Sequence, residues 1–241
     1  MQKIIILYLL LCLPAALYAQ DENYASDRPG LTDAPDLIGK KTWQIASGAD
    51  ISRYNHYGVY QLSSNTLKYG LSKRFEARLD LGLQYDPEAH HYSVSGPSIG
   101  MKTLITGQHN VIPKTAFILE YYPPGFASGT TASGLGMEFC FSHTFKNGNS
   151  FYYNLGSNWT DLSQKATLNA LAGYSLNLNS VWNVFAEIYV YKAPSIHLNY
   201  VSDLGVTFQV TKRLQLDLAT GLDIVHPAGN SYFDGGITLN F

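Results

Sequence analysis

The sequence is poor in cysteine, in charge and in long apolar runs. Its two cysteines are Cys12 and Cys140, and Cys12 lies in the first nineteen residues, which we expect to be removed, so neither a disulfide framework nor a cysteine zinc site is expected. Charged residues make up 14% of the chain, against about 25% in a typical soluble domain. The formal net charge of −2 gives no attraction to nucleic acid, which is therefore not an expected partner.

The first nineteen residues have the pattern of a secretory signal peptide. Lys3 precedes an apolar stretch that begins at Ile4 and ends in small residues near Ala19, which predicts cleavage after Ala19. No later segment approaches the roughly 18 consecutive apolar residues that a membrane-spanning helix needs. The sequence thus predicts an exported chain without a transmembrane helix and with too few charges for an ordinary soluble surface.

Alternation of apolar and polar residues is the dominant pattern after the signal. In residues 75–85, FEARLDLGLQY, every second residue is apolar and the residues between are mostly polar or charged, which is typical of a strand with two unlike faces. The sequence predicts twelve such strands, at 42–53, 58–71, 75–85, 96–106, 110–122, 134–145, 150–160, 165–178, 181–192, 196–210, 213–224 and 231–241. We expect an all-β fold.

The connections between these segments predict the architecture. Every second connection is a tight turn, as at 72–74 and 211–212, whereas 86–95, 123–133 and 225–230 are longer. A transmembrane up-and-down antiparallel barrel of the Gram-negative outer membrane has this asymmetry, with short periplasmic turns and longer external loops. An even number of strands also returns both ends of the barrel to the periplasm.

A soluble sandwich or barrel is the competing interpretation, since it would also alternate. A soluble barrel, however, needs its charges outside, whereas here the polar face is mostly Asn, Gly, Ser and Thr beside an uninterrupted apolar face. Aromatic residues also gather near the ends of the segments, as an interfacial girdle would require. These positions are Trp43, Tyr54, Tyr57, Tyr85, Tyr121, Tyr122, Trp159, Trp182, Tyr191 and Tyr200.

The end of the chain predicts a partner in assembly. Residues 231–241, SYFDGGITLNF, alternate and finish in Phe241. This resembles the C-terminal signal that the bacterial barrel-assembly machinery recognises. We therefore expect that machinery and outer-membrane lipids as partners, with Phe241 as the assembly signal.

Two further segments resemble a known family. Residues 26–35, SDRPGLTDAP, followed by Gly39, Trp43 and Gln44, resemble the N-terminal signature of the outer-membrane barrels labelled as the MetA pathway of phenol degradation, and residues 67–79, LKYGLSKRFEARL, resemble that family's second-to-third strand hairpin. The resemblance implies an outer-membrane barrel that passes small hydrophobic or aromatic compounds. Asp33-Ala34-Pro35 departs from the Glu-Ser-Pro-like stretch of the family.

Three parts are expected: a signal peptide at 1–19, an N-terminal segment at 20–41 and a barrel at 42–241. The N-terminal segment is either a periplasmic leader or a plug folded into the lumen, because its prolines discourage a helix and it does not alternate. In a plug, Arg28 would pair with wall carboxylates and Asp27 or Asp33 with wall lysines. The candidate motif residues are Asp27, Arg28, Pro29 and Asp33.

The alternation also predicts which charged side chains point inward. The expected inward acids are Asp50, Glu76, Asp80, Glu120, Glu138, Glu187, Asp203, Asp217, Asp223 and Asp234, and the expected inward bases are Lys68, Arg78, Lys102, Lys114 and Lys165. We expect most of them to form a buried network, because an unpaired interior charge is costly. An excess of acids would favour cations or neutral solutes, with Glu76 and Asp80 as the strongest cluster and Arg78 able to offset only one of them.

Catalysis and metal binding have weak support. The Ser–His pairs at 142–143, 195–197 and 226–231 lack a recognisable carboxylate partner, and adjacent side chains such as Ser142 and His143 point to opposite faces of a strand. His90 and His91 beside Glu88 could bind a metal from a loop, but such histidines are more often solvated. We expect no enzyme, cofactor or metal site.

The sequence thus favours a passive outer-membrane pore or transporter for an unidentified small molecule. Two alternatives remain open. One is a closed structural barrel that acts through its external loops, and the other is a lipid-modifying barrel enzyme. Twelve strands lie between the eight that side chains just fill and the 16–18 of an aqueous channel, so the strand number allows an open or a plugged lumen.

Overall fold

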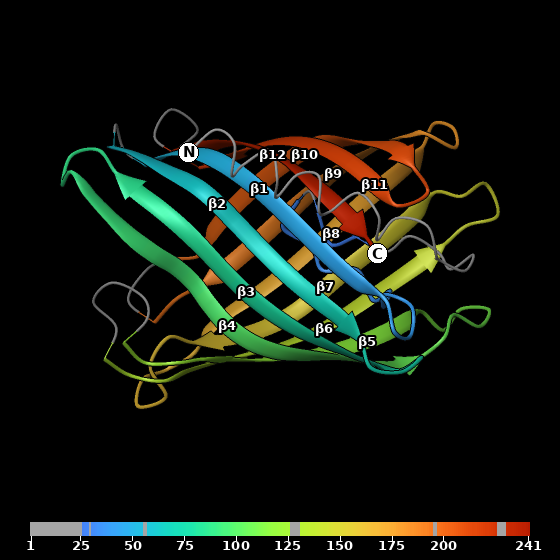
Figure 1. The fold of residues 1–241 in the computed structure, drawn as a ribbon, viewed down its shortest axis with the longest axis horizontal. Helices are drawn as coiled ribbons and strands as arrows, with labels where there is room; N and C mark the ends of the chain where they lie inside the picture. The colour runs from blue at the N-terminus through green and yellow to red at the C-terminus, as the bar shows by residue number, and fades with distance from the viewer. Residues whose placement is uncertain (1–25, 29, 55–56, 126–130, 195–196, 226–229) are drawn as a thin grey trace, which may run out of the picture.

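A computed structural model gives the fold (Figure 1). It describes residues 26–28, 30–54, 57–125, 131–194, 197–225 and 230–241. The expected signal peptide and Pro29 lie outside these residues. Within the described part of the chain, no helix is long and apolar enough to cross a membrane.

The described residues form twelve strands in one closed antiparallel barrel, which confirms the predicted fold class. Each strand pairs with its sequence neighbours, and β12 pairs with β1 to close the ring. The strands are β1 Trp43–Tyr54, β2 Tyr57–Gly70, β3 Phe75–Asp86, β4 His91–Thr106, β5 Lys114–Tyr122, β6 Gly134–Thr144, β7 Ser150–Trp159, β8 Thr167–Asn177, β9 Trp182–Lys192, β10 Asn199–Thr211, β11 Leu214–Asp223 and β12 Asn230–Asn240. Closure leaves no exposed sheet edge, as a strand-built membrane span requires.

Two predicted connections were wrong. The long loop expected at 86–95 is largely strand, because Asp86 pairs with His91 and the hairpin turns within 87–90. The Asp86 carboxylate accepts the amides of Glu88 and Ala89, and these bonds hold the tight turn. Conversely, β5 begins at Lys114 rather than at residue 110, so residues 107–113 form a longer connection than the sequence predicted.

The apolar face of each strand points outward. Leu81 is 51% and Leu218 is 50% exposed, whereas their inward-facing neighbours Gly82 and Asp217 are buried. Apolar residues outside and charges inside are the reverse of a soluble barrel, which excludes the soluble interpretation. The outer wall is built to contact lipid.

The aromatic positions divide between the two faces. Trp43, Tyr121 and Trp182 are exposed on the outer wall, at strand ends, as an interfacial girdle requires. Tyr122 and Tyr191 were wrongly placed in the girdle, because Tyr122 donates to Glu120 and Tyr191 lines an interior cavity. The side chains of Tyr54 and Tyr57 lie outside the described residues.

The last strand closes the barrel beside the first. Trp43 and Phe241 exchange two backbone hydrogen bonds, with N···O distances of 2.8 and 2.9 Å. Phe233 and Ile237 of β12 are exposed outside, while Thr238 is fully buried inside. Because β1 begins and β12 ends at the same rim, Thr42, which directly precedes β1, lies beside the C-terminus at that rim.

Candidate functional site

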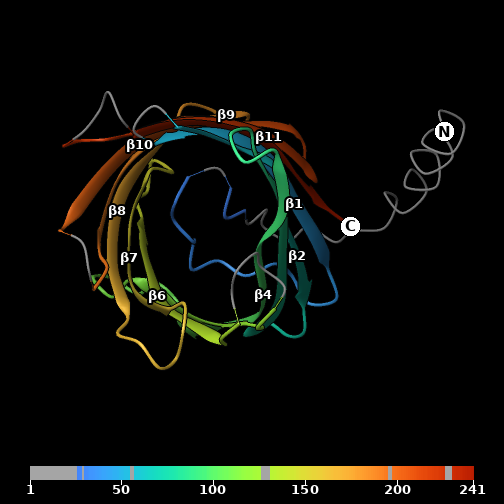
Figure 2. The same ribbon diagram turned by 90° about the vertical axis from the view of Figure 1, so that its left-hand side faces the viewer.

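Residues 26–28 and 30–41, the described part of the segment at 20–41, lie inside the barrel rather than below it. Figure 2 shows this segment, in blue, crossing the lumen within the ring of strands. We call it the N-terminal segment. It joins β1 next to the end of β2, where Lys41 donates its amide to the Gly70 carbonyl at 2.7 Å. A side chain at Gly70 would collide with the Gly39 carbonyl, 1.9 Å from the ideal Cβ position, so a residue without a side chain is needed at this crossing.

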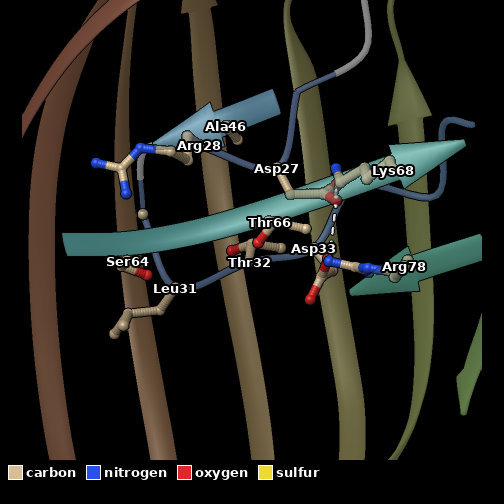
Figure 3. Close-up of a pocket in the computed structure, with 11 residues that line it drawn as sticks. Asp27, Arg28, Leu31, Thr32, Asp33, Ala46, Ser64, Thr66, Lys68 and Arg78 are labelled. Carbon is tan, nitrogen blue, oxygen red and sulfur yellow. Dashed lines mark hydrogen bonds and ion pairs between the residues drawn. The ribbon is translucent and has the colours of Figure 1, made fainter. Parts of the chain in front are cut away.

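Asp27 is the centre of an ionic cluster. Its carboxylate pairs with the ammonium group of Lys68 and with the guanidinium of Arg78 at 3.3 Å, both drawn in Figure 3. It also pairs with the ammonium group of Lys102 at 3.0 Å. Burial alone would raise the pKa of Asp27, but the three cations hold that pKa well below its ordinary value. Asp27 is therefore ionised and fixed to three different strands.

Two further carboxylates of the N-terminal segment contact the same side of the wall. Asp33 pairs with Arg78 at 2.7 Å, and Asp36 pairs with Lys114 at 2.5 Å. The Asp36 and Lys114 side chains are 42% and 30% exposed, so this pair is much wetter than the Asp27 cluster. All four wall cations are thus directed at the segment.

Arg28 points the opposite way, as Figure 3 shows. One guanidinium nitrogen pairs with Asp217 at 3.1 Å and with Asp234 at 2.7 Å. A Cβ at Gly48 would lie 2.2 Å from this guanidinium, and one at Gly236 would lie 2.4 Å from it. These two glycines, paired across the β1–β12 junction, form the seat of Arg28.

Backbone groups of the segment also use wall carboxylates. Glu187 accepts the amide of Leu31 at 2.8 Å and the hydroxyl of Thr32 at 2.5 Å. Glu76 accepts the amide of Ile38 at 2.9 Å. A segment without regular secondary structure leaves amides that need partners when buried, and these acids supply them.

An apolar contact completes the docking. The inward side chains of Ala116, Ile118 and Cys140 form a buried cluster on β5 and β6, and Leu37 packs against it. Sequence reasoning missed this contact. The sequence feature that could have revealed it is a break in the polar inner face, because alternation puts Ala116 and Ile118 at inward positions between Lys114 and Glu120.

The inward bases of the described wall are confined to one side of the barrel, whereas inward acids lie on both sides. The inward bases of the described residues lie on β2 to β5, which we call the basic arc, and are Lys68, Arg78, Lys102 and Lys114. The acidic arc is β9 to β12, with Glu187, Asp203, Asp217, Asp223 and Asp234. The acids of the N-terminal segment meet the basic arc and its arginine meets the acidic arc, so the segment is electrostatically complementary to the lumen.

Other inward acids bond within the wall. Asp80 accepts the hydroxyls of Thr66 and Ser98 at 2.5 and 2.8 Å. The remaining three behave similarly: Asp50 accepts the Ser52 hydroxyl at 2.6 Å, Glu120 accepts the Tyr122 hydroxyl at 2.9 Å, and Glu138 accepts the Asn154 amide at 2.6 Å.

Two sequence interpretations of lumen charge were wrong. Arg78 does not serve Glu76 or Asp80 as its ion-pair partner, because its pairs are with Asp27 and Asp33 of the N-terminal segment. Lys165 is exposed in the connection between β7 and β8, since β8 begins only at Thr167. Alternation within a strand cannot reveal a partner that comes from outside the sheet.

Two cavities flank the N-terminal segment. One has a volume of about 180 Å³ and lies between the segment and residues of β1 to β3, including Ala46, Thr66 and Arg78 (Figure 3). The other, which we call the vestibule, has a volume of about 390 Å³. It lies toward the rim opposite Phe241, where β11 ends at Asp223 and β12 begins at Asn230. Arg28 and Leu31 border both cavities, so this part of the segment separates them.

Among the described residues, the serines and histidines considered for catalysis or metal binding do not come together in a site. Ser142 is buried inside, whereas His143 stacks on Tyr153 at 6.3 Å between ring centroids. His90 lies in the β3–β4 turn, 3.4 Å from the Tyr85 hydroxyl. Ser195 and His226 lie outside the described residues, and within those that are described no three His, Cys, Asp or Glu side chains form a metal-binding group.

Solved structures share this fold. An outer membrane channel from Pseudomonas putida F1 matches with a TM-score of 0.65 and 9% identity, over 89% of this chain and all of that one. The KdgM porin, in complex with disordered oligogalacturonate, matches with a TM-score of 0.60 and 6% identity, over 82% of this chain and 99% of its own. The NanC porin matches with a TM-score of 0.59 and 9% identity, over 81% and 98%.

The outward apolar face and these likenesses place the barrel in the bacterial outer membrane. No curated protein matches the sequence. A family model does match it, over residues 26–241, which include both the N-terminal segment and the whole barrel. The chain belongs to the family described as "Putative MetA-pathway of phenol degradation".

Proposed function

We propose that the protein is an outer-membrane channel for small molecules whose N-terminal segment is a plug. The observation that carries this proposal is the ionic docking of the segment inside the lumen. Asp27 and Arg28 are adjacent in sequence, yet they pair with opposite arcs of the wall. A segment held from both sides closes the passage, and it can reopen because its contacts are largely ionic rather than a packed hydrophobic core.

The family implies that the solute is a small hydrophobic or aromatic compound. The vestibule supports an aromatic or apolar solute, since Tyr189, Tyr191 and Leu222 line it. The KdgM porin was solved with oligogalacturonate, which is a polyanion. A similar ligand is disfavoured here, because the acidic arc would repel it.

Catalysis is not proposed. The similar solved structures are described as channels and porins, and His143 lies apart from the buried Ser142 side chain. The closed structural barrel remains the competing function, and conductance distinguishes it from a channel.

The test compares the natural protein with a variant whose plug is uncoupled from the wall. Asp27→Asn, Arg28→Gln and Asp33→Asn together remove the ion pairs of the Asp27 cluster and of Arg28, leaving only the more exposed Asp36–Lys114 pair, and the two Asn side chains keep the shape of the carboxylates. In planar bilayers we expect small or rare currents from the natural protein and larger, longer-lived steps from the variant. Asp161→Asn, in an exposed loop, is the matched control. Equal currents from a folded variant, with the gel shift of a closed barrel on heating, would support the structural barrel instead.

We also propose that Phe241 is part of the assembly signal. Its backbone bonds to Trp43 complete the β1–β12 junction, and alternation on β12 ends there. Deletion of Phe241 should lower the amount of protein in the outer membrane, while the molecules that do assemble conduct normally. Membrane fractions analysed by immunoblot measure this, and an unchanged amount would remove the assembly role.

A further inference from the structure

The vestibule has the chemistry of a cation site. Three of its lining side chains are carboxylates, namely Asp50, Asp223 and Asp234. Arg28 is the one base among the described residues that line it. Asp50 accepts a hydrogen bond from Ser52 at 2.6 Å, and no base of the described chain forms an ion pair with it. A positive charge in this cavity would therefore meet more negative than positive groups.

The same cavity also offers ring contacts. Tyr189 and Tyr191 line it, with ring centroids 5.5 Å apart and planes inclined at 29°. Leu31 of the N-terminal segment and Leu222 add apolar surface. Tyrosine faces attract cations as well as flat apolar groups. An occupant with both a positive charge and an apolar or aromatic body would use all of these contacts.

The protein already places one cation at the edge of this cavity. The guanidinium of Arg28 borders the vestibule and binds both oxygens of Asp234, at 2.9 and 2.7 Å. Asp234 keeps a side-chain exposure of 16%, so a molecule in the vestibule can reach it. The wall around Asp234 is thus demonstrably able to accommodate a planar, positively charged group.

We propose that the vestibule binds small molecules that join a protonated amine or amidine to an aromatic or apolar body, and that this cation competes with Arg28 for Asp234. A bound cation weakens one of the two ion pairs that hold Arg28 against the acidic arc. The solute itself would then loosen the plug on that side. This inference rests on the proposed function, because it takes the rim that bears the vestibule to be the external one. It adds the chemical class of the solute.

The test uses benzamidine, with benzamide as a neutral analogue of the same shape and benzoate as the anion. Calorimetric titration of the purified, detergent-solubilised protein at low salt should show benzamidine binding roughly tenfold more tightly than benzamide, and benzoate should not bind. Added salt should weaken benzamidine binding, because the cavity is open to solvent. Equal affinities for benzamidine and benzamide, or a preference for benzoate, would overturn the proposal.

Two variants separate the cation site from the competition with Arg28. Asp50→Asn should weaken benzamidine binding several-fold, whereas the exposed-loop variant Asp161→Asn should leave it unchanged. Arg28→Gln should strengthen benzamidine binding, because it removes the competitor for Asp234. Unchanged binding in Asp50→Asn would reject the site, and weaker binding in Arg28→Gln would reject the competition.

These measurements do not depend on a current. If benzamidine binds as described but the plug-uncoupled variant never conducts, the cation site stands and the channel proposal fails. If the variant conducts but benzamidine and benzamide bind alike, the channel stands and this solute class is wrong.

Discussion

The basic and acidic arcs hold the same segment by different means. On the basic arc, three cations from three strands converge on one carboxylate, that of Asp27. On the acidic arc, a single cation, Arg28, serves two carboxylates and fits against Gly48 and Gly236. The first arrangement depends on charge, whereas the second depends on charge and on the absence of side chains. The two sides of the plug should therefore respond differently to substitution.

The largest expected effect is on the basic arc. Asp27→Ala leaves the buried cations Lys68 and Lys102 without their main partner, and breaking a buried ionic cluster costs about 3–5 kcal/mol. We expect the segment to undock and the conductance to rise. Thermal unfolding and bilayer recordings measure the two effects.

A matched control lies on the same arc. Asp36→Ala removes the exposed pair with Lys114, and such pairs contribute about 0–1 kcal/mol. A similar loss of stability in Asp27→Ala and Asp36→Ala would show that burial does not determine how much the ion pairs of the basic arc contribute to stability.

The contact of Arg28 with the acidic arc can be disrupted without changing any charge. Gly48→Ala puts a methyl group where the Arg28 guanidinium lies. Because the guanidinium is the end of a flexible side chain, it can move aside at little cost to the fold, but in doing so it loses its ion pairs with Asp217 and Asp234. We expect Arg28 to leave its seat and single-channel openings to become more frequent. Gly58→Ala is the control, because nothing lies within 4 Å of a Cβ at that position. If both alanines behave alike, the glycine seat has no role in closure.

The smallest expected effect concerns pH. The pKa of Asp27 in the folded protein is lowered by its three cations. Its contribution to stability is complete above the unfolded pKa of about 3.9 and is lost only as the pH falls below it, through the folded pKa. Bilayer currents should therefore stay low between about pH 8 and pH 5. Opening of the natural protein as the pH falls from 6 to 5 would place the acid-sensitive group elsewhere, because Asp27 stays ionised in that range.

Much of the fold was predictable because the information is local. A strand that contacts lipid on one face and a polar lumen on the other must alternate, and the twelve predicted segments match the twelve strands. The β3–β4 connection was mispredicted for a local reason as well. Pro87 and the two histidines suggested a long loop, whereas Tyr92 and Val94 continue the alternation of β4 outward.

The site was only half predictable. Opposite charges in a short polar segment suggested that Arg28 would meet carboxylates and Asp27 would meet lysines, and the structure has both contacts. The Arg28 seat could not be inferred in this way. Gly48 and Gly236 become neighbours only when β12 closes on β1, and nothing in either local sequence reports that pairing. Leu37 was equally hidden, because its partners lie on β5 and β6.

The covalent attachment of the N-terminal segment to β1 has a kinetic consequence. Released residues 26–41 would still be anchored at Trp43 and could reach no farther than about 60 Å when extended. A tethered segment of this length returns to its binding site at an effective concentration in the millimolar range. Redocking would thus be fast and independent of the amount of protein in the membrane. The expected behaviour is a flickering conductance, with brief openings that end when the tethered segment of the same molecule redocks.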